Sequence, residues 1–323
     1  MRIIPGHTNS LIDVGGLKVG QAHDAKVKTG ATVILPDRAV TCAVDIRGGG
    51  PGTREAAALQ DGGLIDSVHA IVLSGGSVYG LAAADGVTSF LGDKGIGYAA
   101  GPAPIPVSPI VPAAILFDNA NGGDKGWGNN PPFRGLGFAA CHAARAGIAE
   151  GEAGAAYGAT AGLYQGGLGS ASEVIDGITV AAIIAANPVG SPYMPGTKCF
   201  WAWPYEVDGE FGGLRPSADY HYHIARDSKL EFLKTGGQST IIGAVATNAK
   251  LGQKALKRLA IMAQDGIAMA VQPSHTPLDG DTIFALSTGD EACDSPPHLA
   301  ELGAAAARCV ARAIARGIFA AAK

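Results

Sequence analysis

Residues 236–247 read Gly236-Gly237-Gln238-Ser239-Thr240-Ile241-Ile242-Gly243-Ala244-Val245-Ala246-Thr247 and predict a buried strand that begins at Thr240, shortly after a glycine pair. A threonine freed at a new N-terminus would carry its own general base, because an α-amine has a pKa of about 7.7–8.0 and can take the hydroxyl proton near neutral pH. Ser-Thr also begins many strands through turn chemistry or β-propensity alone. The stretch therefore predicts either a self-cleaving hydrolase with Thr240 as its nucleophile or an ordinary strand start.

A second stretch, residues 273–282, reads Pro-Ser-His-Thr-Pro-Leu-Asp-Gly-Asp-Thr and carries two carboxylates, Asp279 and Asp281. They lie 39 and 41 positions after Thr240. Side chains at i and i+2 of an extended segment point to the same side, so both carboxylates can face Thr240 if the two strands are neighbours. The competing interpretation is a Pro-Leu-Asp-Gly-Asp turn with no part in catalysis.

These two stretches resemble the corresponding segments of peptidase family S58, which contains the DmpA-like aminopeptidases, the β-peptidyl aminopeptidases and the endo-type nylon-oligomer hydrolases. The shared patterns are Val-Ala-Thr-Asn at residues 245–248 and a His-Thr-Pro-x-Asp-Gly-Asp-Thr-like segment at residues 275–282. Further motifs that resemble the family follow one another in the same order, at residues 45–55, 74–87, 110–118, 166–172 and 186–190. The resemblance thus extends through most of the chain.

The resemblance implies a single domain over residues 1–323 with an α+β fold, a four-layer αββα sandwich like that of N-terminal-nucleophile hydrolases. It also implies that the precursor cuts itself between Ser239 and Thr240, which would leave one piece of residues 1–239 and another of residues 240–323. Processed units would then assemble into a homo-oligomer, a tetramer or an octamer.

The resemblance also implies roles for individual side chains. Asp279 and Asp281 would hold the freed amine and orient the hydroxyl, and the side-chain amide of Asn187 would donate to the oxyanion. Asn187 precedes a proline, so a turn starter is the alternative for that residue. Two positions expected to bind substrate depart from the family: Phe117 falls where several members have Tyr, and Gln165 falls where nylon-hydrolase-like members have Lys.

Three functions follow from these residues. The first is an autoprocessing aminopeptidase that acts on small peptides, amino-acid amides or esters with a free amine. The second is an endo-type amidase on 6-aminohexanoate-like oligomers, which Gln165 in place of Lys disfavours. The third is a non-enzymatic ligand-binding protein of the same fold, in which the bond between Ser239 and Thr240 is never cut. Ser239 is a third departure from the family, whose members more often have Asn or Gly before the cut.

The composition excludes several other classes of protein. With 47% hydrophobic and 16% charged residues, the 323-residue chain can bury a large core. Its net charge of −4 does not provide the positive charge that nucleic-acid binding requires.

Residues 1–7 lack the apolar region of a secretory signal and no run is long enough for a membrane span, so we expect a cytoplasmic protein. Five scattered cysteines indicate reduced thiols, and His221 and His223 lack a third ligand at metal-site spacing. No cofactor or metal is expected.

The order of the elements can also be predicted. Residues 68–73, 178–186 and 283–286 read as strands, and residues 79–91 and 251–270 as helices, while residues 188–239 read as a long irregular loop. A last helix places Arg308, Arg312 and Arg316 on one face at i, i+4 and i+8, which predicts a solvated face or a subunit contact.

Overall fold

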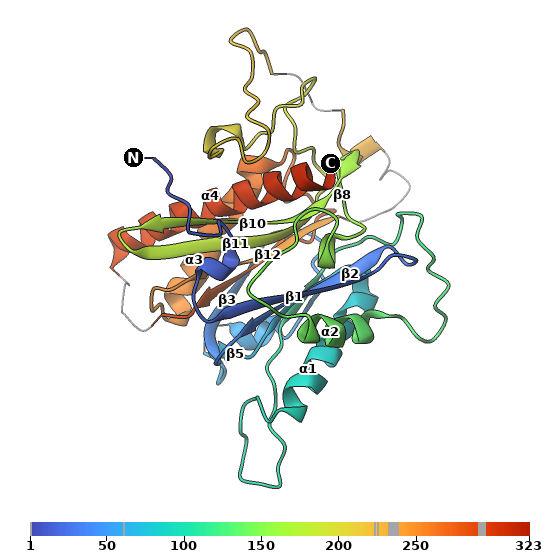
Figure 1. Ribbon diagram of the computed structural model, residues 1–323, viewed down its shortest axis with the longest axis vertical. Helices are drawn as coiled ribbons and strands as arrows, with labels where there is room; N and C mark the ends of the chain where they lie inside the picture. Colours follow the sequence, from blue (N-terminus) through green and yellow to red (C-terminus); the bar gives the residue numbers. More distant parts are fainter. Residues whose placement is uncertain (1, 61, 223, 225, 232–238, 290–294) are drawn as a thin grey trace.

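Two β-sheets face each other at the centre of the molecule (Figure 1). The computed structural model describes residues 2–60, 62–222, 224, 226–231, 239–289 and 295–323. The five-stranded sheet has the order β1 (Leu17–Asp24), β2 (Thr29–Pro36), β6 (Ile71–Ser74), β7 (Ala113–Ile115) and β4 (Thr53–Arg54). The six-stranded sheet has the order β10 (Gly167–Ile175), β11 (Ile178–Asn187), β12 (Thr240–Thr247), β13 (Thr282–Ser287), β3 (Val40–Ile46) and β5 (Ser67–Val68). A small separate ladder joins β8 (Thr160–Ala161) to β9 (Tyr164–Gln165).

Helices cover the outer face of each sheet. Helices α1 (Ala83–Asp93) and α2 (Phe133–His142) pack on the five-stranded sheet, and α3 (Gln253–Ala270) and α4 (Pro296–Ala321) pack on the six-stranded sheet. Apolar cores fill the space between the sheets and beneath each helix pair. Short 3₁₀ helices complete the chain: η1 (Leu11–Asp13), η2 (Ala56–Leu59), η3 (Ser77–Ala82), η4 (Gly154–Ala156), η5 (Trp203–Tyr205) and η6 (Lys229–Glu231). These four layers are the αββα sandwich predicted from the sequence.

Strand β12 lies in the interior of the six-stranded sheet, antiparallel to β11 and parallel to β13. All eight of its residues are buried, which explains why it reads as a nearly continuous apolar run instead of an alternating one. Two parallel neighbours need a crossover connection, and α3 supplies it. Because β12 and β13 run in the same direction, the beginning of β12 lies beside the loop that leads into β13.

The high glycine content lets helices approach the sheet closely. A Cβ added at Gly169 in β10 would lie 2.0 Å from the carbonyl oxygen of Ala313 in α4, so any side chain there would push the helix away. The alanine-rich face of α4 packs onto β10 and β11 in the same way. The glycines inside apolar runs therefore serve close packing in this layer.

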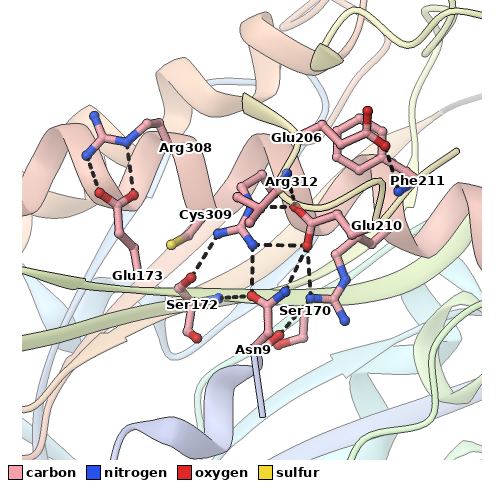
Figure 2. A network of polar contacts seen from close by, with 12 residues as sticks. Asn9, Ser170, Ser172, Glu173, Glu206, Glu210, Phe211, Arg308, Cys309 and Arg312 are labelled. Carbon is pink, nitrogen blue, oxygen red and sulfur yellow. Dashed lines mark hydrogen bonds and ion pairs between the residues drawn. The ribbon is translucent and has the colours of Figure 1, made fainter. Parts of the chain in front are cut away.

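The arginines of the last helix are held in a polar network beneath a loop (Figure 2). The side chain of Arg312 has no exposed surface and contacts Glu210, Asn9 and the carbonyl oxygen of Ser172. Arg316 contacts Glu150 and Glu210, and Arg308 makes two hydrogen bonds to Glu173. The prediction of a solvated face is wrong for Arg312, because helical spacing cannot reveal that a loop carrying Glu210 returns to cover that face.

Two element boundaries differ from the prediction. Residues 68–73 do not form one strand, because β5 ends at Val68 in one sheet and β6 begins at Ile71 in the other. The chain crosses between the sheets at His69 and Ala70, a step that a continuous apolar run does not reveal. The helix predicted from residue 79 begins as η3, and only its second part, α1, is α-helical.

The remaining predictions concern loops, thiols and membranes. Within the described part of residues 188–239, η5 and η6 are the helices, and the segment is otherwise mostly irregular. Cys42, Cys141, Cys199 and Cys309 are buried free thiols, whereas Cys293 lies outside the described residues. His223 also lies outside them, and the described residues contain no cluster of metal-binding side chains. Among the described helices, none combines the length and the apolar character that a bilayer crossing requires.

Candidate active site

Thr240 is the first residue of β12 and is almost fully buried. Its hydroxyl donates a hydrogen bond to the carbonyl oxygen of Ser239, the residue before it. Ser239 is also buried, and its N–H donates to the carbonyl oxygen of Leu278 at 2.9 Å. In the uncut chain, the hydroxyl expected to act as nucleophile is therefore directed at the peptide bond expected to be cut.

Gly280 supplies a second contact to the same carbonyl. Its N–H donates to the oxygen of Ser239 at 3.0 Å. A Cβ built at Gly280 would lie 2.9 Å from the hydroxyl oxygen of Thr240 and 2.7 Å from the carbonyl oxygen of Gly50. The absence of a side chain thus lets the backbone approach the Thr240 hydroxyl, and the Gly280 N–H contacts the Ser239 carbonyl oxygen as an oxyanion-hole donor would.

Asp281 lies beside the start of β12 and holds the backbone next to Thr240. One carboxylate oxygen accepts the N–H of Ile241 at 2.8 Å, and the other pairs with Nδ1 of His275 at 2.7 Å. The predicted neighbourhood of Asp281 and Thr240 is thus present in the structure. The described bonds of Asp281 go to Ile241 and His275 and position Thr240 through the main chain.

Asp279 has a different set of partners. One of its oxygens accepts the N–H of Val189 at 3.0 Å, and the other accepts the N–H and hydroxyl of Thr276 at 3.0 and 2.6 Å. Burial and the charge of Asp281 raise the pKa of Asp279 above its ordinary range, although these hydrogen bonds act in the opposite direction. Asp279 therefore joins the segment after Asn187 to residues 273–281, the acidic loop that leads into β13.

The first prediction concerns His275. Burial would lower its pKa, but the hydrogen bond to Asp281 and the charge of that carboxylate outweigh burial and raise the pKa. A raised folded pKa means that protonation stabilises the fold fully below the unfolded value of about 6.5, and this contribution disappears as pH rises through the folded value. We expect His275→Gln to lower the free energy of unfolding more at about pH 5.5 than at about pH 8.5.

Urea denaturation measures this free energy best in an uncut Thr240→Ala background, where one chain unfolds. If His275→Gln lowers the free energy of unfolding equally at both pH values, the result contradicts the ion pair with Asp281.

Asn187 ends β11 directly opposite Thr240 in the strand register. Its side-chain oxygen accepts the N–H of Thr160 at 2.9 Å, and its amide nitrogen donates to the carbonyl oxygen of Phe117 at 2.8 Å. The residue lies in the site as expected, but in this state its described donor contact goes to Phe117 and not to the Ser239 carbonyl. Phe117 therefore reaches the site through its main chain.

Gln165 lies in β9, where its amide donates to the carbonyl oxygen of Ala159 at 3.2 Å.

Lys229 is a site residue that the sequence did not indicate. Its ammonium lies 3.1 Å from the hydroxyl oxygen of Ser239, 2.9 Å from the carbonyl oxygen of Thr160 and 3.2 Å from the side-chain oxygen of Asn187. Burial lowers the pKa of Lys229 to about 7, although the charge of Asp279 acts in the opposite direction. Lys229 begins the short helix η6 within a stretch whose sequence reads as irregular, so no periodic pattern could have revealed this position.

The glycine-rich motif at residues 45–55 binds the main chain of the acidic loop through backbone hydrogen bonds. Arg47 donates its N–H to the carbonyl oxygen of Asp281 at 3.0 Å, and Gly50 donates to that of Asp279 at 2.8 Å. A Cβ at Gly48 would lie 2.3 Å from the carbonyl oxygen of Asp279, so the motif needs a glycine to come this close. The motif thus fixes the main chain around Gly280 on the side away from β12.

The chain is similar in sequence to a protein family and to several known proteins. The family model described as Peptidase family S58 matches residues 9–323. An uncharacterized aminopeptidase of Mycobacterium tuberculosis is 40% identical over an alignment that covers 96% of this chain and 94% of that protein. A 6-aminohexanoate-oligomer endohydrolase of a Kocuria species is 30% identical, with 88% of this chain and 76% of that protein covered.

A solved structure shares the fold at low sequence identity. The L-aminopeptidase D-Ala-esterase/amidase of Ochrobactrum anthropi, described as a variant of the Ntn hydrolase fold, superposes with a TM-score of 0.73. It is 21% identical, and the superposition covers 99% of this chain and 88% of that one. This likeness confirms the fold class predicted from the sequence.

Proposed function

The chain belongs to peptidase family S58, and from this premise we propose that it is an autoprocessing N-terminal-nucleophile hydrolase with Thr240 as its nucleophile. One observation carries the proposal: the carbonyl oxygen of Ser239 accepts hydrogen bonds both from the Thr240 hydroxyl and from the Gly280 N–H. An ordinary strand start needs neither a hydroxyl directed at the preceding carbonyl nor a second donor on the same oxygen.

Self-cleavage would proceed by an N-to-O acyl shift. The Thr240 oxygen attacks the Ser239 carbonyl carbon, and the Gly280 N–H stabilises the charge that develops on the carbonyl oxygen. The bond to the Thr240 nitrogen then breaks, the hydroxyl proton ends on that nitrogen, and an ester links Ser239 to the Thr240 oxygen. Water hydrolyses the ester and leaves a carboxylate on Ser239 and a free Thr240 amine.

Substrate hydrolysis would use the same atoms with one addition. The freed α-amine of Thr240 takes the hydroxyl proton, so the nucleophile carries its own base. Asp281 fixes the start of β12 through Ile241, and Asp279 fixes the neighbouring turn through Val189. These two carboxylates act as positioning residues for the hydroxyl and the amine.

An aminopeptidase is the preferred form of the hydrolase. The relative that is 40% identical across almost the whole chain carries that name, whereas the oligomer endohydrolases are 30% identical. The endo-type amidase is the second candidate because those endohydrolases still align over most of this chain. A cytoplasmic location and the assembly of processed units into a homo-oligomer also belong to this proposal. Size-exclusion chromatography of the mature protein tests the assembly.

The second prediction tests the aminopeptidase. Because an acidic loop lies beside the amine of Thr240, the site should favour small acyl groups that carry a free amine of their own. We expect alanyl p-nitroanilide to be hydrolysed at least about tenfold faster than its N-acetylated form, since one lost charge-assisted contact has that effect. Release of p-nitroaniline measures both rates, and equal rates would move the endo-type amidase to first place. No turnover together with a single uncut band on a denaturing gel would favour the ligand-binding protein.

The third prediction concerns the acidic pair. Asp281→Asn should slow self-cleavage and turnover together by about 10- to 100-fold, the effect of losing a hydrogen bond to a charged group. Asp279→Asn should act in the same direction. Asp265→Asn is the matched control, because this carboxylate on α3 forms an exposed ion pair with Arg47, of a kind that contributes little. Wild-type rates in both site variants would show that the acidic loop is only a structural turn.

A further inference from the structure

We propose, on the basis of the function above, that Lys229 recognises the side chain of the substrate's acyl residue. The site should therefore prefer amides of amino acids with a hydroxyl on Cβ, serine first. The proposal rests on which residue occupies the acyl position in the uncut chain and on what surrounds its side chain.

Ser239 marks the acyl position because self-cleavage and substrate hydrolysis share an intermediate. In self-cleavage, the Ser239 acyl group becomes an ester on the Thr240 oxygen. In turnover, the acyl group of the substrate becomes an ester on the same oxygen, and the same water attack releases it. The contacts of Ser239 therefore describe the subsite in which a substrate acyl residue lies.

Each polar group of Ser239 has a partner in addition to the contact between its carbonyl oxygen and the Thr240 hydroxyl. Its N–H donates to the carbonyl oxygen of Leu278 at 2.9 Å, and its carbonyl oxygen accepts the N–H of Gly280 at 3.0 Å. Its side-chain oxygen faces the ammonium of Lys229 at 3.1 Å. Ser239 has no exposed surface in the uncut chain, so these contacts are shielded from water. The first two contacts suit any amino acid, and only the third depends on the side chain.

Lys229 is held in place by groups that do not depend on the bond to be cut. Its ammonium donates to the carbonyl oxygen of Thr160 and to the side-chain oxygen of Asn187, and its own N–H donates to the carbonyl oxygen of Val189 at 2.9 Å. Burial deprives this amine of water and lowers its pKa, so each oxygen that accepts a hydrogen bond from it favours its charged form. A site built to hydrogen-bond a hydroxyl discriminates against an analogue that lacks it.

Seryl and 2-aminobutyryl p-nitroanilides test the proposal, because they differ only in a hydroxyl against a methyl group. For the processed wild-type enzyme we expect kcat/KM to be about 10- to 100-fold higher for the seryl amide, the range for one hydrogen bond to a charged group. In Lys229→Met the ratio should fall to about 1. Lys198→Met is the matched control, because that ammonium lies over the rings of Tyr164 and Tyr193, and the ratio should not change.

A variant at Ser239 probes the same contact from the other side, even if Lys229→Met is not processed. Ser239→Ala removes the oxygen that Lys229 faces, so self-cleavage should slow by about 10- to 100-fold. Once processed, this variant should keep the wild-type preference for seryl amides, because residue 239 is then no longer the acyl residue.

The outcomes distinguish a failure of this proposal from a failure of the proposed function. Turnover of both amides at similar rates by the wild type would overturn the role of Lys229 and leave the hydrolase intact. The same holds for a seryl preference that persists in Lys229→Met. Hydrolysis of no aminoacyl amide by processed protein would overturn the aminopeptidase and this proposal together.

Discussion

The Thr240→Ala variant is expected to remain a single chain of 323 residues and to hydrolyse no amide at a measurable rate. The Thr240 hydroxyl is the side-chain group directed at the Ser239 carbonyl, and an alanine offers no atom that could replace it. Loss of the nucleophile of a hydrolase costs on the order of 10⁶ in kcat. Intact mass spectrometry of the purified protein decides the processing part, since the wild type should give pieces of 239 and 84 residues.

Two control variants belong to this experiment. Thr240→Ser keeps a hydroxyl at the same place and should still cut before residue 240. Thr247→Ala removes an equally buried threonine at the other end of β12 and should be processed like the wild type. If Thr240→Ala still splits at the same bond, Thr240 is not the nucleophile.

Gly280→Ala is expected to slow self-cleavage and turnover by about 10²–10³-fold, the effect of losing one oxyanion donor. The added Cβ would lie within 3 Å of both the Thr240 hydroxyl oxygen and the Gly50 carbonyl oxygen, so the loop must shift. Such a shift moves the Gly280 N–H away from the Ser239 carbonyl oxygen. The time course of the full-length band on a denaturing gel and kcat/KM of the mature form measure the two steps.

Gly252→Ala provides the comparison for this substitution. Gly252 precedes α3, and a Cβ added there meets no atom within 4 Å, so the change tests the loss of a glycine without a clash. Wild-type processing in Gly280→Ala would show that the N–H of this residue does not assist the reaction.

Strands and helices of the second half of the chain could be predicted because each buries one continuous apolar pattern. Strand β12 begins at Thr240 as expected, and α3 and β13 follow in the predicted order. The prediction of one strand over residues 68–73 is wrong because this apolar run contributes residues to two different sheets. A sheet crossing is a tertiary event, and hydrophobicity within a short window reports only burial.

The candidate site was predictable where a motif carries it and unpredictable where tertiary contacts carry it. Asp281 and Asn187 lie close to Thr240 because the strand register places them there. Lys229 and Arg312 have no local signal, because each contacts a group that lies far away in the sequence: Asn187 for Lys229 and Glu210 for Arg312. Charge patterns along a chain describe exposure only when nothing folds back over them.

The position of β12 and β13 between β11 and β3 determines what a cut before Thr240 would do to the physical state of the protein. The shorter product would contribute two inner strands and both helices of one layer, with strands of the longer product on either side. Dilution would not separate the products, because separation requires global unfolding. Once unfolded, however, the two pieces would have to meet again, so refolding would change from a first-order to a second-order reaction. The mature protein would then owe its persistence to slow unfolding and not to an equilibrium that it can readily re-establish.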